Sequence, residues 1–330
     1  MATKDVLKHG NNYVSEINDA DSSDFEAYET YSRKKLDEKF LRIRDVCYDW
    51  AGKTIIVEGD SVSHYGVTDY LQDALGCTAI LHGISGEPVY SDTDGLERDF
   101  RKRISAYSPE ADAIIIIGDV NHTGMVTGSS TLQGTIWSDD ITSWFGKYNT
   151  ALQGLKKSYP TVPIFLVAEF GMSESKQKTT YNVATYYQQL ARRWSCIYID
   201  LTTECSLDLR YASSVWGNTV NDSVHPSVDA MKLAMEVIVR KLKQIPPFEF
   251  TGEDSISFES EVTVTVGETV DLTVTKTGDL STQWKSDDTT IATVLGGKVW
   301  GMAAGTAIIT ATTRNGNTAT CTVTVKEATE

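Results

Sequence analysis

Residues 53–63 read Lys-Thr-Ile-Ile-Val-Glu-Gly-Asp-Ser-Val-Ser, so that a short apolar run ends in a turn-forming triplet. The run predicts a strand covered on both faces, because its large residues follow one another without polar alternation. Gly59 allows the chain to bend sharply after this strand, and the bend leaves the Ser61 hydroxyl facing a cleft. A serine in this setting is a candidate nucleophile.

Four further apolar runs follow, and helical patterns lie between them. Strands are expected at 78–82, 111–117, 162–168 and 196–200, and helices at 66–76, 95–107, 139–158, 179–194 and 227–243. This alternation is typical of an α/β fold, a three-layer domain with a parallel sheet. Sites in such sheets lie at the carboxyl ends of the strands, so the loops after residues 58, 82, 117, 168 and 200 are the candidates.

The character of the chain changes at about residue 255, where Thr and Val alternate between regularly spaced glycines. Short alternating strands with turn signals predict an all-β sandwich. The segment resembles a bacterial Ig-like domain of group 2, on the stretches 264–269 (Val-Thr-Val-Gly-Glu-Thr), 284–288 (Trp-Lys-Ser-Asp-Asp), 291–294 (Ile-Ala-Thr-Val) and 298–311. The resemblance implies a module that adheres, spaces or decorates rather than one that catalyses.

These patterns divide the chain into four parts: 1–50, 51–247, a linker at 248–254, and the Ig-like sandwich at 255–330. The first part is polar and then carries an amphipathic helix, which begins at the capping box Ser23-Asp-Phe-Glu26 and ends before Gly52. This helix is expected to pack against the α/β domain, or else to form a helical oligomer or an attachment site.

Composition excludes several classes of function. The net charge of −15 disfavours nucleic-acid binding, and no apolar run approaches the roughly 20 residues of a membrane helix. The N-terminus lacks the layout of a secretory signal, so synthesis in the cytosol is expected. The five cysteines are odd in number and have no C-x-x-C spacing, so neither a disulfide framework nor a zinc site is predicted.

A second candidate element lies at residues 222–226, Asp-Ser-Val-His-Pro. Pro226 favours a helix that starts directly after His225, which would hold the imidazole at the rim of the sheet. His225 then has the residue type of a general base, and Asp222 has that of the carboxylate that orients it. The alternatives are that Ser61 is a plain turn residue and His225 a helix-capping residue.

Five short blocks in the predicted order resemble the SGNH (GDSL-type) hydrolases over about residues 50–245. The blocks are Gly59-Asp-Ser61, Gly83-Ile-Ser-Gly86, Gly118-Asp-Val-Asn-His122, Asp222 and His225. The resemblance implies a flavodoxin-like fold that hydrolyses esters, often acetyl groups on carbohydrates, without a metal or an organic cofactor.

The same resemblance assigns roles to individual residues. Ser61 would be the nucleophile and, through its backbone N–H, one oxyanion-hole donor. Gly86 and Asn121 would complete that hole, with Gly83 as an alternative to Gly86. His225 would act as base and then acid, and Asp222 would orient it.

The third block departs from the family pattern Gly-x-Asn-Asp, since Asp119 stands at the glycine position and His122 at the final one. We therefore expect a rearranged support for this loop and an altered pose of Asn121.

Aromatic residues and histidines near these loops are candidates for substrate contact, because aromatic faces stack on sugar rings. We assign substrate binding to Trp216, Tyr65 and His64, although His64 and His122 also suit structural hydrogen bonds. Tyr211 and Trp137 are further candidates, whereas Trp144 is expected in the core.

The sequence thus predicts an esterase that removes short acyl groups, acetyl above all, from a polysaccharide or another acylated glycan. A phage virion component acting outside the cell on host surface glycan fits the domain pairing, with virion contacts through residues 1–50 or the Ig-like domain. A secreted bacterial esterase is the alternative placing. A catalytically silent glycan-binding or structural protein on the same fold is the alternative function.

Overall fold

The computed structural model describes residues 8–9, 12–13, 47–90, 99–119, 121, 123–169, 174–205, 225–247 and 252–328. The chain forms two units, residues 1–47 and 48–330. In the first unit two short strands, β1 (Lys8–His9) and β2 (Asn12–Tyr13), pair antiparallel. Within the described ranges, no helix has both the length and the apolar character that crossing a bilayer requires.

The predicted amphipathic helix lies outside the described residues as far as residue 46, and its predicted end is wrong. Cys47–Trp50 are not helical. The Tyr48 N–H donates to Lys243 O at 2.8 Å, and the Trp50 indole donates to Leu242 O at 2.9 Å. This segment is therefore held by long-range bonds to the end of helix α10 (Val228–Lys243), which local periodicity does not report.

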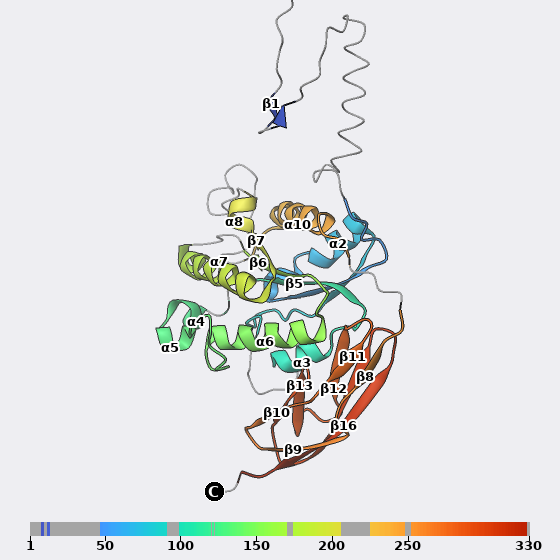
Figure 1. Cartoon of the computed structure of the whole chain (residues 1–330). Coiled ribbons are helices and arrows are strands. Elements are labelled where there is room, and N and C mark those ends of the chain that lie inside the picture. The colour runs from blue at the N-terminus through green and yellow to red at the C-terminus, as the bar shows by residue number, and fades with distance from the viewer. Residues whose placement is uncertain are drawn as a thin grey trace, which may run out of the picture. The chain divides into compact units, whose positions relative to one another are not determined.

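A five-stranded parallel sheet forms the centre of the second unit, as predicted (Figure 1). Its strands are β3 (Thr54–Gly59), β4 (Thr78–Leu81), β5 (Ala111–Ile117), β6 (Ile164–Ala168) and β7 (Ile197–Asp200). Their order is β4-β3-β5-β6-β7, the doubly wound order of flavodoxin-like folds. Every residue of β5 is buried, since helices cover both faces of the sheet.

Alternate side chains of the strands pack into two separate hydrophobic cores, one on each face of the sheet. Ile55 and Val57 pack with α2 (Val67–Leu75) and α10, whereas Ile56 packs on the opposite face. That second face is covered by α3 (Phe100–Ser105), α6 (Trp144–Ser158) and α7 (Glu174–Trp194). Short helices α4 (Thr123–Thr127), α5 (Ser130–Gln133) and α8 (Leu201–Glu204) lie in the connections. Figure 1 shows the resulting three layers.

Two helices begin at residues that differ from those predicted by hydrophobic periodicity. Helix α6 starts at Trp144 rather than at residue 139, because the Ser143 side chain caps it by accepting from the Gly146 N–H. Helix α7 starts at Glu174 rather than at residue 179. Its first five residues are all polar, so they give no apolar signal although they suit a helix.

The C-terminal part is an all-β sandwich, as predicted. Its strands are β8 (Ser255–Ser257), β9 (Glu261–Thr265), β10 (Thr269–Asp271), β11 (Thr275–Thr277), β12 (Thr282–Ser286), β13 (Ala292–Leu295), β14 (Lys298–Gly301), β15 (Gly305–Thr313) and β16 (Thr318–Lys326). The two larger sheets have the orders β12-β15-β16-β9 and β10-β14-β13. Trp284 and Ile309 lie in the core between them.

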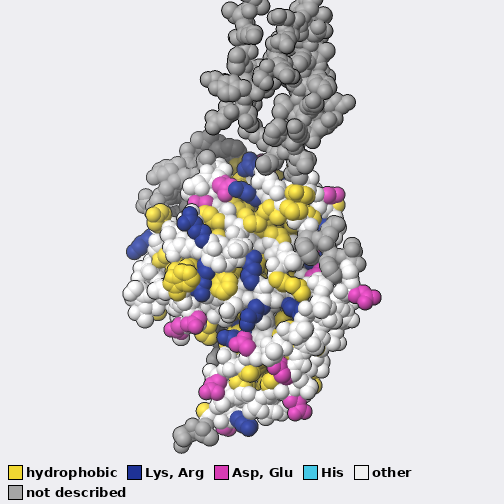
Figure 2. All heavy atoms as spheres, in the orientation of Figure 1, with side chains coloured by type: hydrophobic (Ala, Val, Ile, Leu, Met, Phe, Trp, Pro, Cys, Tyr) yellow, Lys and Arg dark blue, Asp and Glu magenta, His cyan; other side chains and the backbone are white. Residues whose placement is uncertain are grey.

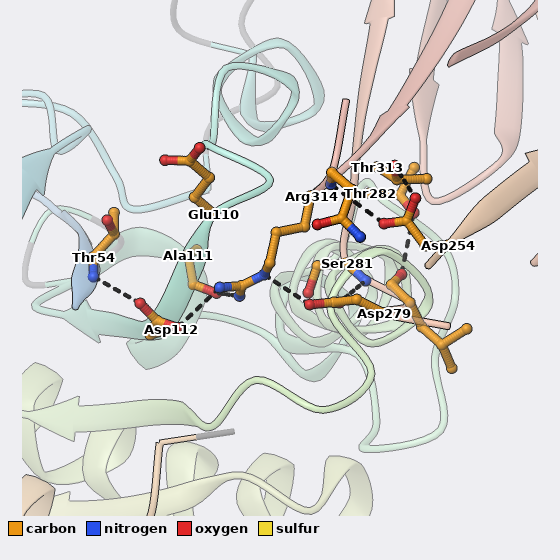
Figure 3. A network of polar contacts seen from close by, with 12 residues as sticks. Thr54, Glu110, Ala111, Asp112, Asp254, Asp279, Ser281, Thr282, Thr313 and Arg314 are labelled. Carbon is orange, nitrogen blue, oxygen red and sulfur yellow. Dashed lines mark hydrogen bonds and ion pairs between the residues drawn. The ribbon is translucent and has the colours of Figure 1, made fainter. Parts of the chain in front are cut away.

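The sandwich packs directly on the α/β domain through a buried polar network (Figure 3). Arg314, in the turn between β15 and β16, lies between Asp112 at the start of β5 and Asp279 of the sandwich. Its guanidinium is 3.0 Å from Asp112 and 2.8 Å from Asp279, and it donates to Ala111 O at 2.7 Å. Asp112 also accepts the Thr54 N–H at 2.8 Å. Arg314 therefore joins the sandwich to β5 directly and to β3 through Asp112.

Apolar packing continues across the same junction. Leu295 and Trp300 of the sandwich belong to the core cluster that lies under α3 and α6. Gly154 of α6 allows this approach, because a Cβ there would lie 2.2 Å from Leu295 Cγ. The two domains therefore share one continuous core over this face of the sheet.

Candidate active site

The candidate nucleophile lies where β3 meets a short 3₁₀ helix, η1 (Ser61–His64). Asp60 caps this helix, since its carboxylate accepts the Val62 N–H at 3.0 Å. Gly59 is required here, because a Cβ would meet Ile117 O at 2.4 Å on the neighbouring strand. Ser61, the first residue of η1, is thus fixed at the carboxyl end of β3 and keeps 6% of its surface exposed.

The candidate base comes from the other end of the α/β domain. His225 is half-buried and lies just before helix α10, which Ser227 caps by accepting from the Ala230 N–H at 3.2 Å. His225 Nε2 lies 2.8 Å from Ser61 Oγ, across 164 residues of sequence. With Nε2 unprotonated, the Ser61 hydroxyl donates to it, which is the geometry of a nucleophile beside its base.

Asp60 and Asp119 join the nucleophile loop to the loop after β5. The Asp119 N–H donates to Asp60 Oδ2 at 2.9 Å. The Asp119 carboxylate accepts the Val89 N–H at 3.1 Å and the Trp144 indole N–H at 2.5 Å. Asp119 has a φ of +95°, the region that favours glycine. Asp119 therefore has a backbone conformation that favours glycine, and its carboxylate anchors the loop after β5 to Val89 and Trp144.

Glu58 is a positioning residue that sequence reasoning missed. It is fully buried at the end of β3, accepts the Gly59 N–H at 2.9 Å, and forms an ion pair with Arg103 of α3. The Tyr107 hydroxyl donates to its other oxygen at 2.6 Å. Burial raises the pKa of Tyr107 well above 10, so this phenol remains a donor. A charged residue that ends an apolar strand is a signal that could have marked Glu58.

The predicted oxyanion-hole residues lie on the loops after β4 and β5. Gly86 is exposed in a turn with a φ of +81°, and a Cβ there would meet no neighbour. Gly83 is packed against the nucleophile loop instead, since a Cβ would lie 2.2 Å from Ser63 Oγ. Asn121 is half-buried, and its amide donates to Glu87 O at 3.1 Å, which leaves a second N–H on the same nitrogen.

The two predicted substrate contacts within the described residues have other partners. His64 Nε2 lies 3.1 Å from Gly83 O, so this ring joins η1 to the loop after β4, in agreement with the structural alternative. The Tyr65 ring stacks on His225, with centroids 5.1 Å apart and planes at 24°. His64 is exposed and Tyr65 half-buried, so the role of each in substrate binding stays a prediction.

Four candidates lie outside the described residues: Asp222, Trp216, His122 and Tyr211. Two other aromatic candidates are described. Trp144 is fully buried, as predicted, and holds Asp119 through its indole. Trp137 is 74% exposed, and its ring stacks on the guanidinium of Arg193 on α7 at 4.9 Å.

Comparison with known proteins identifies the sandwich. Residues 254–323 match the sequence profile of the bacterial Ig-like domain (group 2), which confirms the predicted module. None of the curated proteins searched matches the chain.

Several solved structures have a chain trace similar to part of this chain. A protein from Lactobacillus plantarum is 20% identical, with a TM-score of 0.47, over 58% of this chain and 95% of that one. A variant of an acetyl xylan esterase from Geobacillus stearothermophilus is 18% identical, with a TM-score of 0.42, over 59% and 96%. A structure described as a GDSL-like lipase from Bacteroides uniformis is 19% identical, with a TM-score of 0.42, over 59% and 97%.

Proposed function

We propose that this chain is a serine hydrolase of the SGNH type that removes short acyl groups, acetyl above all, from an acylated polysaccharide. The observation that supports it is the 2.8 Å separation of Ser61 Oγ and His225 Nε2 at the carboxyl end of strand β3. An activated hydroxyl of this kind attacks acyl carbonyls, so an ester is the substrate class that fits.

The reaction follows from this geometry in two steps. Ser61 Oγ attacks the acyl carbonyl while His225 Nε2 takes the hydroxyl proton, and the resulting imidazolium then protonates the departing sugar alcohol. Water next attacks the acyl-enzyme, with His225 again as base, and releases the carboxylic acid. Oxyanion donors from the Ser61 backbone, Gly86 and Asn121 belong to the same proposal, as does Asp222 as the group that orients the imidazole.

The low exposure of Ser61 supports a short acyl group. Only 6% of its surface is accessible, and Gly59, Gly83 and Ser63 pack closely on one another beside it. A small acyl group reaches such a hydroxyl with less displacement of the surrounding loops than a long chain does. We therefore expect p-nitrophenyl acetate to be cleaved at least 10-fold faster, in kcat/KM, than the octanoate.

The test is ester hydrolysis by the wild type and by Ser61→Ala and His225→Gln. Each change is expected to lower kcat on p-nitrophenyl acetate by about 10³-fold or more, since the two groups act as one unit. Ser130→Ala is the matched control, because this exposed serine begins helix α5 away from the site. Acetate release from a panel of acetylated polysaccharides then identifies the substrate.

Wild-type protein that binds glycan but cleaves no ester would overturn the proposal in favour of the silent binding protein. Activity that survives Ser61→Ala would overturn the assignment of the nucleophile. The virion placement and action outside the cell stay predictions, with the pairing of a hydrolase-type domain and an Ig-like domain as their support.

A further inference from the structure

We propose that Tyr65 is a positioning residue for the general base, and that it acts through the face of its ring rather than by binding substrate. This inference rests on the proposed function, because it gives the Tyr65 ring a role in the Ser61–His225 pair. Its basis is the stack of the two rings, with centroids 5.1 Å apart and an interplanar angle of 24°.

The backbone fixes the Tyr65 ring on both sides. Tyr65 ends η1, and its N–H donates to Val62 O at 3.2 Å. Gly66 follows with a φ of +73° and starts helix α2. The side chain is half-buried against the core formed with α2 and α10. The Tyr65 backbone is thus held between η1 and α2, and Tyr65 directly follows the short helix that carries the nucleophile.

The stack supplies a constraint that the Ser61–His225 hydrogen bond lacks. That bond fixes the direction of Nε2, but by itself it does not oppose rotation of the ring about the axis of the bond. A parallel aromatic face restricts that rotation and keeps Nε2 aligned with Ser61 Oγ. The negative face of the phenol ring also attracts the imidazolium that forms when Ser61 gives up its proton.

A role of the ring face and a role of the hydroxyl predict different effects for two substitutions of Tyr65. Tyr65→Phe keeps the aromatic face and removes only the hydroxyl, so kcat and KM on p-nitrophenyl acetate are expected to stay within about twofold of the wild type. Tyr65→Leu keeps apolar volume but removes the face, so kcat is expected to fall about 10-fold while KM changes less than twofold.

Tyr70→Leu is the matched control. Tyr70 is also half-buried and packs against the same core from α2, so it reports the general cost of a Tyr→Leu change there. The midpoint of thermal unfolding is measured for all three variants, which separates loss of fold from loss of alignment.

A fluorophosphonate probe gives a second measurement that needs no ester turnover. Ser61 Oγ attacks phosphorus, the P–F bond breaks, fluoride leaves, and His225 takes the proton. The rate of phosphonylation, followed by intact mass, therefore reports the alignment of the pair. We expect Tyr65→Leu to be labelled about 10-fold more slowly than the wild type, and Tyr65→Phe and Tyr70→Leu at nearly the wild-type rate.

The outcomes separate the two proposals. Wild-type kcat in Tyr65→Leu, or a raised KM in Tyr65→Phe, would overturn the role of Tyr65 and leave the hydrolase proposal intact. Labelling of Ser61 without any ester cleavage would overturn the hydrolase proposal, and the labelling rate of Tyr65→Leu would still decide the role of Tyr65. A wild type that is neither labelled nor active would overturn both.

Discussion

Asp119 shows how a residue other than glycine is held at a positive φ. A non-glycine residue at a φ of +95° is strained, and only strong local bonds keep it there. Here both carboxylate oxygens accept from buried N–H groups, those of Val89 and Trp144, while the Asp119 N–H donates to Asp60. The hydrogen bonds of the Asp119 carboxylate therefore offset the backbone strain of a positive φ.

Two substitutions of Asp119 test this balance. Asn offers one acceptor where two are needed and turns an NH₂ group toward a donor, so we expect the free energy of unfolding to fall by about 1–3 kcal/mol. Gly relieves the backbone strain but leaves the Val89 and Trp144 N–H groups without the carboxylate. We therefore expect Asp119→Gly to lower the free energy of unfolding by more than Asp119→Asn does. Urea unfolding measures both, with exposed Asp73→Asn on α2 as control. A Gly variant as stable as the wild type would contradict this account.

At the scale of elements, helix α6 is shaped to receive the sandwich. Gly154 has no side chain where Leu295, which is 2% exposed, packs on the helix. Alanine is the better helix former by about 1 kcal/mol, so Gly154→Ala would stabilise an isolated helix. In the whole protein we expect Gly154→Ala to destabilise the fold instead, because the new methyl group overlaps Leu295 of β13.

A double-mutant cycle tests this packing. We expect Gly154→Ala and Leu295→Ala each to destabilise the protein, the second by about 2–5 kcal/mol through the cavity it leaves. The pair is expected to cost clearly less than the sum, since the methyl group enters that cavity. Leu132→Ala, at a residue 45% exposed on α5, is the control for loss of a leucine. Strict additivity would show that the two residues do not pack together.

Strand β11 adds a half-buried amine to the same junction. Lys276 Nζ donates to Lys157 O near the C-terminus of α6 at 2.9 Å, and to Leu280 O and Thr282 Oγ1 at 2.8 and 3.2 Å. Burial lowers the pKa of Lys276 from 10.5 to about 8. Between those pH values the unfolded chain binds the proton more tightly than the folded one, so this group makes stability rise with pH.

Lys276→Met removes this titration. The difference in unfolding free energy, wild type minus variant, is expected to increase from pH 8 to pH 10.5 by about 1–2 kcal/mol, a value reduced from the full shift because the amine is partly exposed. Urea unfolding at several pH values measures it, with Lys298→Met on β14 as control. A difference that is flat or falls over this range would contradict the lowered pKa.

At the scale of the whole molecule, residues 48–330 form one compact unit despite their two architectures. The shared core beneath α3 and α6 and the buried Asp112–Arg314–Asp279 network both join the domains. An interface of this kind couples the unfolding of its two sides, in contrast to a module that swings on a linker. The Ig-like domain thus packs directly on the domain whose sheet carries Ser61, and we expect the two to unfold together.

Calorimetry tests this coupling. We expect one thermal transition for residues 48–330 rather than separate transitions for the two domains. Arg314→Ala leaves Asp112 and Asp279 buried without their cation, so it is expected to lower that single transition, at a cost of about 3–5 kcal/mol. Exposed Arg192→Ala on α7 is the matched control. Two resolved transitions in the wild type would contradict a shared core.

The sequence by itself determined the order of the strands along the chain, the α/β class, the sandwich, and the two loops that carry Ser61 and His225. These features follow from local signals, since apolar runs report burial and glycine, proline and capping residues report turns. Only the tertiary structure decided that Asp119 accepts from Val89 and Trp144 at a positive φ, that Tyr65 lies on His225, and that Glu58 meets Arg103 and Tyr107. It also decided that the sandwich shares the α/β core. Each of these contacts joins side chains from elements that meet only after the chain has closed long loops, so no periodicity along the sequence encodes them.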